Sequence, residues 1–372
     1  MFFRKECIYL DAAATSRFKP KKVIRRISEE LSHSANAGRG GHKASIHALE
    51  CVEECRRRIA EMTGFENAIL TKSCTEALNL ALCGGEYTGE VLTDVFEHNS
   101  VLRPLERLKL KGVKVRYLSP ADGVITTDLL KSNLTGKTSL VCIQEMSNVT
   151  GTIQPIDDLG NLLSSFGIPF LVDGAQSLGH TDCSYKGVTM LAGAGHKALH
   201  GMQGTGFLAV RNGVRLTPLI AGGTGTSSAS LLQPKDIPEG FEAGTQNAAG
   251  FAGLAEGIVW TMKNKEKIRA ATVRLSERLL KGLSAIEGVE VYSKSPNGVI
   301  SFNVGEHSSS SVADTLDSEY SIAVRAGLHC APLMHKFLGT FNRGAVRASV
   351  DWGNTDSDID ALLKAVREIA RR

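Results

Sequence analysis

An aspartate at position 173 and a lysine at position 197 are the two side chains whose types and setting best suit chemistry on a bound ligand. The apolar run 168–172 predicts a buried parallel strand that ends at Asp173. A second apolar run, 188–192, predicts a strand that delivers Lys197 to the same edge. Open α/β sheets bind ligands at the carboxyl ends of their strands. We therefore expect the carboxylate and the amine to face one crevice.

A lysine and an aspartate in one crevice suit a site for pyridoxal phosphate. The lysine would form a Schiff base with the cofactor aldehyde, and the aspartate would keep the pyridine nitrogen protonated so that the ring can accept electrons from a substrate carbanion. The alternative is a structural role, in which Asp173 caps a loop and Lys197 is solvated. These two positions alone leave both interpretations open.

A phosphate-binding helix start is indicated after the predicted strand that ends at Thr71. Ser73, Cys74 and Thr75 stand where the next helix should begin. Free backbone N–H groups, the helix dipole and a hydroxyl at such an end suit a phosphate. An ordinary capped helix is the alternative.

Polar residues follow other predicted strands at the same edge. The ring of His98 could stack on a cofactor, while Asn148 and Gln176 could bond its phenolic oxygen. Each of them alone could be a satisfied loop residue. Their repeated placement at one edge is what indicates a site.

Strands and helices alternate along the first two thirds of the chain. This rhythm predicts an α/β fold whose sheet is mainly parallel and doubly wound. We expect a large domain over residues 15–255. Residues 256–372 predict a smaller α+β domain, joined by residues 1–14.

Composition excludes several classes of protein. The 372 residues are 42% hydrophobic, which excludes a disordered chain, and the net charge of +4 is spread rather than clustered. Neither nucleic acid nor a membrane surface is therefore indicated as a partner. No apolar run is long enough to span a membrane and the start lacks the features of a secretory signal, so we expect a soluble cytoplasmic protein.

Eight cysteines without any Cys-x-x-Cys pair predict thiols in a reducing compartment. His47, Cys51 and Cys55 recur every four residues on one face of a predicted helix, which could indicate part of a metal site. No fourth ligand is evident. We therefore favour small cysteines on a buried helix face and expect no metal.

Short motifs spread over nearly the whole chain give it a specific resemblance. The chain resembles the cysteine desulfurase and selenocysteine lyase group of the class V aminotransferase family, which are pyridoxal phosphate enzymes with the aspartate aminotransferase-like fold. The motifs are Tyr9-Leu10-Asp11 with Ala13-Ala14-Thr15, Ser73 to Glu76, Glu97-His98-Asn99, Ser147 to Thr152, Val172 to Gln176, Gly195-His196-Lys197, Phe241 to Thr245 and Arg325 to Pro332.

The resemblance implies roles for individual residues. Lys197, Cys330 and His98 would be the catalytic residues, with Asp173 as the pyridinium partner and Gln176 bonding the phenolate. The residues implied to hold the phosphate are Cys74, Thr75, His196 and, from the second subunit of a homodimer, Thr245. The residues implied to bind the substrate are Asn148 and Arg347, with Arg325 and His47 as outer members.

Cys330 is implied to be the nucleophile. Its basic neighbours Arg325 and His329 favour the thiolate form. The implied reaction converts L-cysteine to L-alanine and leaves a persulfide on Cys330, whose sulfur passes to an acceptor for iron–sulfur cluster or other sulfur-compound assembly. Because only Ala331 and Pro332 separate Cys330 from the apolar Leu333, we expect an acceptor or activator protein to come to the site.

Three positions depart from the family pattern. Ala194 stands where a hydroxyl residue usually helps to hold the phosphate, Ala12 where Asn or Ser is more common, and Met202 where Pro is more common. Two other functions stay open. One is a selenocysteine lyase, and the other is a non-catalytic sulfur-binding scaffold on the same fold.

Overall fold

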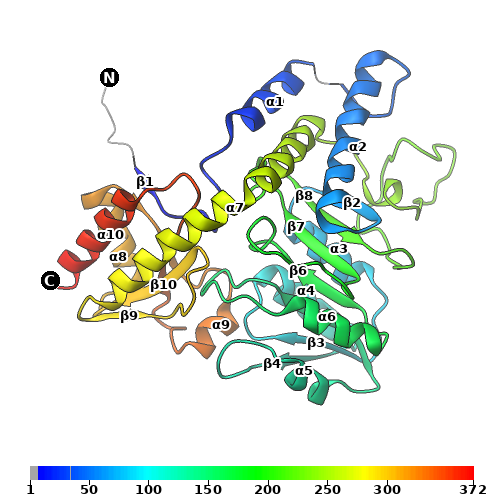
Figure 1. Ribbon diagram of the computed structural model, residues 1–372. Coiled ribbons are helices and arrows are strands. Elements are labelled where there is room, and N and C mark those ends of the chain that lie inside the picture. The colour runs from blue at the N-terminus through cyan, green and yellow to red at the C-terminus, as the bar shows by residue number, and fades with distance from the viewer. Residues whose placement is uncertain (1–6, 34) are drawn as a thin grey trace.

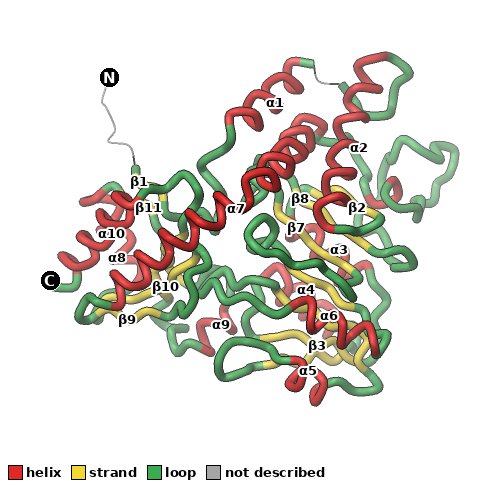
Figure 2. Tube along the Cα trace, in the orientation of Figure 1, coloured by secondary structure: helices red, strands yellow, loops and turns green. Residues whose placement is uncertain are grey.

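A seven-stranded sheet dominates the computed structural model, which describes residues 7–33 and 35–372 (Figures 1 and 2). Its strand order is β2-β8-β7-β6-β5-β3-β4. The strands are β2 (Asn67–Thr71), β3 (Glu90–Asp94), β4 (Lys114–Leu118), β5 (Thr138–Gln144), β6 (Phe170–Asp173), β7 (Met190–Ala194) and β8 (Gly206–Val210). Because β3 to β7 are parallel to one another, the predicted mainly parallel sheet is confirmed.

β8 is the strand that the sequence analysis did not predict. It runs antiparallel to both of its neighbours, β7 and β2. Gly206 is the first residue of β8 and pairs with Ala194 and Thr71. Its position brings β8 against the start of α3.

Helices cover both faces of this sheet. The helices of this part are α1 (Lys21–Ser32), α2 (Lys43–Thr63), α3 (Cys74–Gly84), α4 (Asn99–Leu110), α5 (Thr127–Asn133), α6 (Ile156–Ser165) and α7 (Ala248–Ser284). α2, α5, α6 and the first part of α7 share one apolar core with Phe170 and Val172 of β6, while α3 and α4 share another with Leu171. Burial on both sides explains why β6 is apolar throughout until Asp173.

A second, smaller sheet is antiparallel, with the order β12-β13-β10-β9. Its strands are β9 (Val289–Val291), β10 (Val299–Val304), β12 (Arg325–Gly327) and β13 (Ala345–Ser349). The second part of α7, α8 (Ser309–Tyr320) and α10 (Asp356–Ile369) pack with it in one core, and α9 (Pro332–Phe337) lies between β12 and β13 in sequence. α10 was not predicted, although Thr355 and Asp358 form a capping box at its start.

α7 runs from the large sheet to the small one without a break (Figure 1). The predicted domain boundary at residues 255 and 256 falls inside this helix, and the division stays a prediction. Of the N-terminal segment predicted to join the smaller domain, residues 1–6 lie outside the described residues, while β1 (Ile8–Tyr9) pairs with β11 (Ile322–Ala323). Within the described residues, no helix has the length and apolar content that crossing a bilayer requires.

Candidate active site

Most of the predicted cofactor residues line one pocket. It lies at the start of α3 and at the carboxyl ends of β5, β6 and β7, because the ends of parallel strands share an edge. Ala194 also lines it. The predicted site residues that line this pocket are Cys74, Thr75, His98, Asn148, Asp173, Gln176, His196 and Lys197.

Asp173 and Lys197 are the charged pair of the pocket. Within the described residues, the Asp173 carboxylate accepts two hydrogen bonds, and both use Oδ1, from Ala175 N at 2.9 Å and from Cys74 Sγ at 3.5 Å. Oδ2 is left for a ligand. Burial raises the pKa of Asp173 and lowers the pKa of Lys197, and the opposite charge of each partner limits both shifts. A lower lysine pKa increases the fraction of free amine, the form that attacks a carbonyl.

His98 caps the start of α4 with its ring. Its Nδ1 accepts a hydrogen bond from Ser100 N at 3.0 Å. Burial, together with the charge of Lys197, lowers the pKa of His98 to about 4, so the ring is neutral at pH 7 and carries its proton on Nε2. Ser100 Oγ lies 2.9 Å from the same Nδ1 and 2.8 Å from Thr75 Oγ1. This hydroxyl therefore links the predicted stacking ring to the predicted phosphate end.

The start of α3 is shaped for a close ligand. Ser73 caps it, its hydroxyl accepting a hydrogen bond from Glu76 N at 3.2 Å, and Cys74 and Thr75 are its first two residues. The N–H groups of a first turn have no acceptor within their own helix. A Cβ on Gly206 would lie 2.5 Å from the carbonyl carbon of Ser73 and 2.7 Å from Cys74 N. β8 can therefore lie this close to the helix start only because residue 206 is glycine.

Two further pocket residues are held by the N-terminal segment. Gln176 Nε2 donates to the carbonyl of Ala13 at 2.8 Å, and His196 Nδ1 lies 3.1 Å from Thr15 Oγ1. Burial and the charge of Lys197 lower the pKa of His196 to about 4. His196 is therefore a neutral ring that can hydrogen-bond a phosphate but adds no charge.

Arg347, on the smaller sheet, does not line the pocket itself but contacts Asn148, which does. It is 1% exposed on β13, donates from Nη1 to the carbonyl of Asn148 at 3.0 Å, and pairs through Nη2 with Asp11 Oδ1 at 2.7 Å. Within the described residues, Arg347 Nε and Asn148 Oδ1 are buried and have no partner. Burial lowers the pKa of Arg347, opposed by Asp11. A guanidinium with an unused donor fits the predicted role in binding a carboxylate.

Cys330 stands on a turn tied to the same region. Its carbonyl accepts a hydrogen bond from Asn99 N at 2.6 Å, next to His98, and the carbonyl of His329 accepts one from Asn148 Nδ2 at 2.8 Å. Arg325 Nη2 lies 3.7 Å from Cys330 Sγ. The turn thus joins the predicted nucleophile to two residues beside the pocket and to the predicted basic neighbour.

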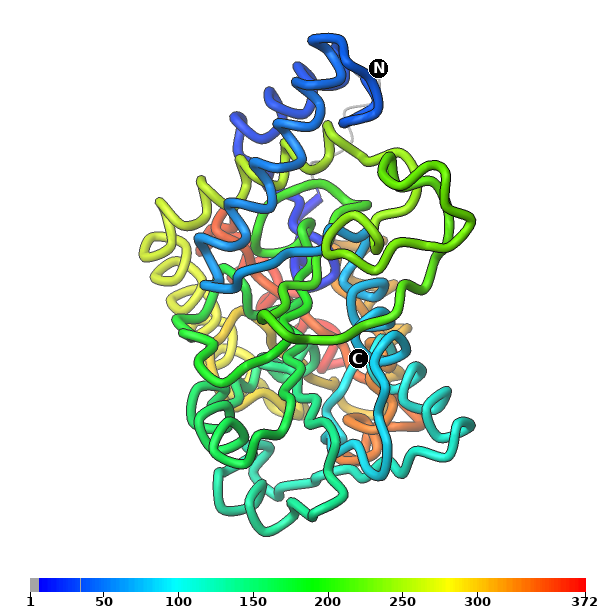
Figure 3. The backbone as a smooth tube through the Cα atoms, turned by 90° about the vertical axis from the view of Figure 1, so that its right-hand side faces the viewer, coloured from blue at the N-terminus to red at the C-terminus, as the bar shows by residue number. Residues whose placement is uncertain are grey.

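Thr245 and His47 do not line this pocket in their own chain. Thr245 is exposed in the segment between β8 and α7, which Figure 3 places beside α2. His47 lies on α2, where its Nε2 is 2.8 Å from Glu30 Oε2 and 3.8 Å from Cys51 Sγ. The roles predicted for both residues stay predictions.

The His47 cluster differs from the pattern in the sequence. Cys55 is fully buried in the core, and Glu30 takes its place beside His47 and Cys51, with the three ligand atoms within 4.8 Å of one another. Arg26 Nη2 lies 3.4 Å from Cys51 Sγ and pairs with Glu30, so a guanidinium already supplies positive charge. Burial raises the pKa of Cys51 to about 11, which disfavours the thiolate that a metal needs.

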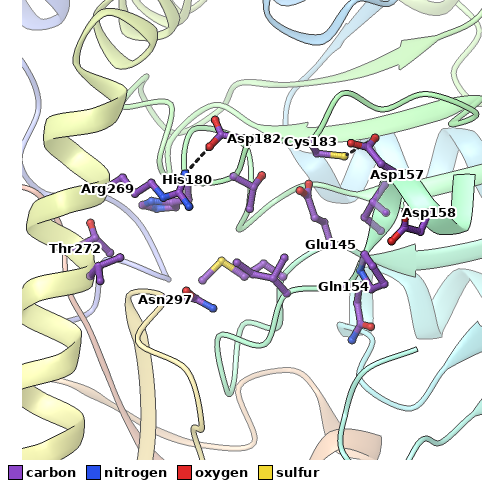
Figure 4. Close-up of a pocket in the computed structure, with 16 residues that line it drawn as sticks. Glu145, Gln154, Asp157, Asp158, His180, Asp182, Cys183, Arg269, Thr272 and Asn297 are labelled. Carbon is purple, nitrogen blue, oxygen red and sulfur yellow. Dashed lines mark hydrogen bonds and ion pairs between the residues drawn. The ribbon is translucent and has the colours of Figure 1, made fainter. Parts of the chain in front are cut away.

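A larger cavity of about 360 Å³ shares one lining residue, Met146, with the pocket of Asp173 and Lys197 (Figure 4). Glu145, Asp157, Asp182, Arg269 and Asn297 are among its lining residues. Arg269 lies on α7, and Asn297 lies between β9 and β10 of the smaller sheet. Asp182 is already paired with Arg269. None of the predicted site residues lines this cavity.

Sequence reasoning missed three residues that hold the site. Ser100 bridges His98 and Thr75, Asp11 pairs with Arg347, and Asn99 bonds the backbone of Cys330. Asp11 and Asn99 lie inside motifs that the resemblance rests on, which is the one signal that pointed to them.

Comparisons with known proteins show the family of the chain. The model of the family described as Aminotransferase class-V matches residues 8–362. The chain belongs to the class-V aminotransferase family. A probable cysteine desulfurase of Methanothermobacter thermautotrophicus is 34% identical, with 98% of this chain and 95% of the relative covered. A cysteine desulfurase of Salmonella dublin is 32% identical, with 98% and 93% covered.

Solved structures of the family are similar over the same length. The apo structure of a cysteine desulfurase from Thermococcus onnurineus has a TM-score of 0.91 at 33% identity and covers 98% of this chain and 95% of that chain. A cysteine desulfurase from Escherichia coli has a TM-score of 0.85 at 26% identity, with 98% and 95% covered. The predicted resemblance to the cysteine desulfurase group of class-V aminotransferases is confirmed.

Proposed function

We propose that this class-V aminotransferase is a pyridoxal phosphate-dependent cysteine desulfurase that forms a persulfide on Cys330. The observation that carries the proposal is the hydrogen-bonded connection of the Cys330 turn to the pocket of Asp173 and Lys197, through Asn148 and Asn99. The similarity to cysteine desulfurases over nearly the full length supports it.

The pocket fits the cofactor chemically. Asp173 Oδ2 is left for a pyridinium N–H, and the start of α3 offers N–H groups beside Gly206, where a Cβ would clash with the helix start. Cys74, Thr75 and the neutral His196 would hold the phosphate, and His98 and Gln176 the ring and its phenolic oxygen. When bound, the cofactor supplies an electron sink for a carbanion at the Cα of the substrate.

The residues of the chain then divide the work. The Arg347 guanidinium, with its unused Nε donor, binds the carboxylate of cysteine, and Arg325 stands beside the sulfur nucleophile. Lys197, whose pKa burial lowers, takes the Cα proton and later returns one.

Sulfur transfer uses the Cys330 thiolate. It attacks the sulfur of the substrate, an S–S bond forms, and the C–S bond breaks with its electron pair going to the carbon skeleton. Protonation of that skeleton releases alanine and leaves the persulfide on Cys330. Because Ala331 and then α9 follow at once, the sulfur cannot travel far, and a protein acceptor or activator must come to the site for iron–sulfur or other sulfur-compound assembly.

A homodimer is part of the proposal. Thr245 is exposed and lies outside the pocket of its own chain, which is compatible with a contact to the phosphate of a partner subunit. Ala194 lines the pocket and has no hydroxyl to donate to the phosphate. The hydroxyl of the partner's Thr245 would replace this missing hydrogen-bond donor.

The decisive experiment measures alanine release from L-cysteine, with pyridoxal phosphate and dithiothreitol present. Cys330→Ser should keep the cofactor absorbance and lose alanine release, while Lys197→Ala should lose both. Cys83→Ser, at a partly buried cysteine outside the pocket, is the matched control and should keep both. Alanine release by Cys330→Ser at the wild-type rate would contradict the proposal, and a higher kcat/KM on L-selenocysteine would favour the lyase.

A further inference from the structure

Two histidines and a threonine form a buried chain of hydrogen bonds directly behind the Cys330 turn. His329 Nδ1 lies 3.2 Å from His335 Nε2, and His335 Nδ1 lies 2.7 Å from Thr340 Oγ1. The exposed fractions of these residues are 2%, 0% and 4%. Nothing in the reaction described above uses this chain, although it begins at the residue next to the nucleophile.

The contacts set the direction of the chain. His329 Nε2 faces the carbonyl oxygen of Arg325 at 3.5 Å, and because a carbonyl can only accept, we assign the proton of His329 to Nε2. Nδ1 of His329 then accepts from His335 Nε2–H, and Nδ1 of His335 accepts from the Thr340 hydroxyl. Every ring nitrogen is thereby satisfied with both histidines neutral.

Neutral rings also fit the surroundings. Burial, followed by the charge of Arg347, lowers the pKa of His329 to about 2, and burial lowers the pKa of His335 to about 4. Arg325 is the other charged group that acts on His329. The prediction that His329 favours the Cys330 thiolate is therefore wrong, because a ring that stays neutral beside two guanidinium groups adds no positive charge and is a poor base. A positioning role is what remains for it.

The backbone that the chain supports is strained. His329 has φ of +50° and Cys330 has φ of +57°, and two successive residues other than glycine rarely adopt this left-handed region. Asn99 and Asn148 hold the two carbonyls of this turn from the large domain, while His335 holds the His329 ring from α9. Thr340 N in turn donates to the carbonyl of His335 at 2.8 Å.

We propose that the chain His329–His335–Thr340 is a brace that fixes the left-handed turn, so that Cys330 Sγ stays beside Arg325 in the position for attack on the substrate sulfur. His329, His335 and Thr340 are thus positioning residues, and the inference rests on the proposed desulfurase function. Loss of the brace lets the turn relax toward ordinary backbone angles, which moves the sulfur without touching the cofactor pocket.

The test compares paired variants of the full-length protein. His335→Gln keeps an N–H donor toward His329 and His335→Leu removes it, while Thr340→Ser keeps the hydroxyl and Thr340→Val removes it. Thr272→Val is the matched control, because the Thr272 hydroxyl is also buried but has no partner among the described residues. We expect His335→Leu and Thr340→Val to lower kcat for alanine release at least about tenfold, with KM for L-cysteine and the cofactor absorbance unchanged. His335→Gln, Thr340→Ser and Thr272→Val should stay within about threefold of wild type.

Amide hydrogen exchange in the protein without cofactor gives a second readout that needs no activity. Exchange in the segment 328–335 should be faster in His335→Leu and Thr340→Val than in their paired variants. Alanine release by the wild type tests the proposed function separately, and the exchange data still test the brace if that release is absent. Equal kcat within either pair, or equal exchange within both pairs, would overturn the inference. If His335→Leu fails to fold, the Thr340 pair decides.

Discussion

Asp94 and Glu97 are buried acids in the segment just before His98. Both side chains are 0% exposed, and within the described residues Asp94 Oδ2 has no hydrogen-bond partner. Phe96 N donates to Asp94 Oδ1 at 2.7 Å. Burial raises the pKa of both groups, for Asp94 to about 7, because an ion is costly there. At least one of the two acids is therefore neutral in the folded protein.

A neutral Asp94 predicts a pH-dependent effect of Asp94→Asn on the free energy of unfolding. Between about pH 4 and 7 the folded protein holds a proton that the unfolded chain has lost, so wild-type stability falls as pH rises through this window. Asparagine can still accept the hydrogen bond from Phe96 N and does not ionise. We expect the variant to match wild type near pH 4.5 and to be more stable at pH 8, as measured by urea unfolding.

Asp157→Asn is the control with the opposite sign. Hydrogen bonds from Ser184 outweigh partial burial and lower the pKa of Asp157, so its contribution is present at pH 7 and is lost as pH falls. That variant should be less stable than wild type at pH 7 and should converge with it at acid pH. If Asp94→Asn lowers stability equally at pH 4.5 and pH 8, Asp94 is ionised in the fold.

At the scale of elements, the site depends on how closely β8 passes the start of α3. Gly206 has an ordinary backbone conformation, so its lack of a side chain matters for contact and not for its φ angle. The atoms that a Cβ would meet, Ser73 C and Cys74 N, are backbone and cannot rotate away. The helix start proposed to hold the phosphate is thus set by a strand that carries no site residue itself.

Gly206→Ala should therefore shift the start of α3 and weaken cofactor retention. We expect a stability loss of about 1–3 kcal/mol, the usual cost of overpacking, together with faster loss of cofactor absorbance on dialysis. Gly136→Ala is the control, because a Cβ there meets nothing within 4 Å and the residue has no positive φ. Cofactor retention equal to that of the control would show that the helix start tolerates the displacement.

The sequence predicted the strands that end at the site because each is an apolar run closed by a polar residue, as at Val172 and Asp173. The sequence did not predict β8. The apolar run of β8 resembles that of a parallel strand, and the antiparallel direction of β8 is set by its connection from β7. Arg347 was assigned by resemblance, and Cys330 by resemblance together with its basic neighbours, since their contacts with Asp11 and Asn99 join residues more than 200 positions apart. The spacing of residues along the sequence cannot predict contacts between residues so far apart.

For the whole molecule, the segment that carries Thr245 is fixed on the outside of its own subunit. Glu242 forms a bidentate ion pair with Arg56 of α2. Glu242 Oε1 also accepts a hydrogen bond from Leu70 N at 2.7 Å. Arg39 donates to the carbonyl of Gly244 at 2.8 Å. These contacts hold the segment against α2, β2 and the loop before α2, and Thr245 within it is exposed.

If each active site of a homodimer is completed by Thr245 of the partner subunit, a mixed dimer of two variants should be more active than a site built from one chain alone would allow. In the mixed dimer, one chain carries Lys197→Ala and the other carries Thr245→Val. The two chains are co-expressed with different tags, and the mixed dimer is purified through both tags. If Thr245 serves the partner's pocket, one of the two sites has both defects and the other has neither, because its Lys197 and the Thr245 that reaches it are both intact. Alanine release should then return to about half of the wild-type rate per dimer, well above that of either variant homodimer. If Thr245 acted within its own chain, each site would keep one defect, and the mixed dimer would release no more alanine than the mean of the two homodimers.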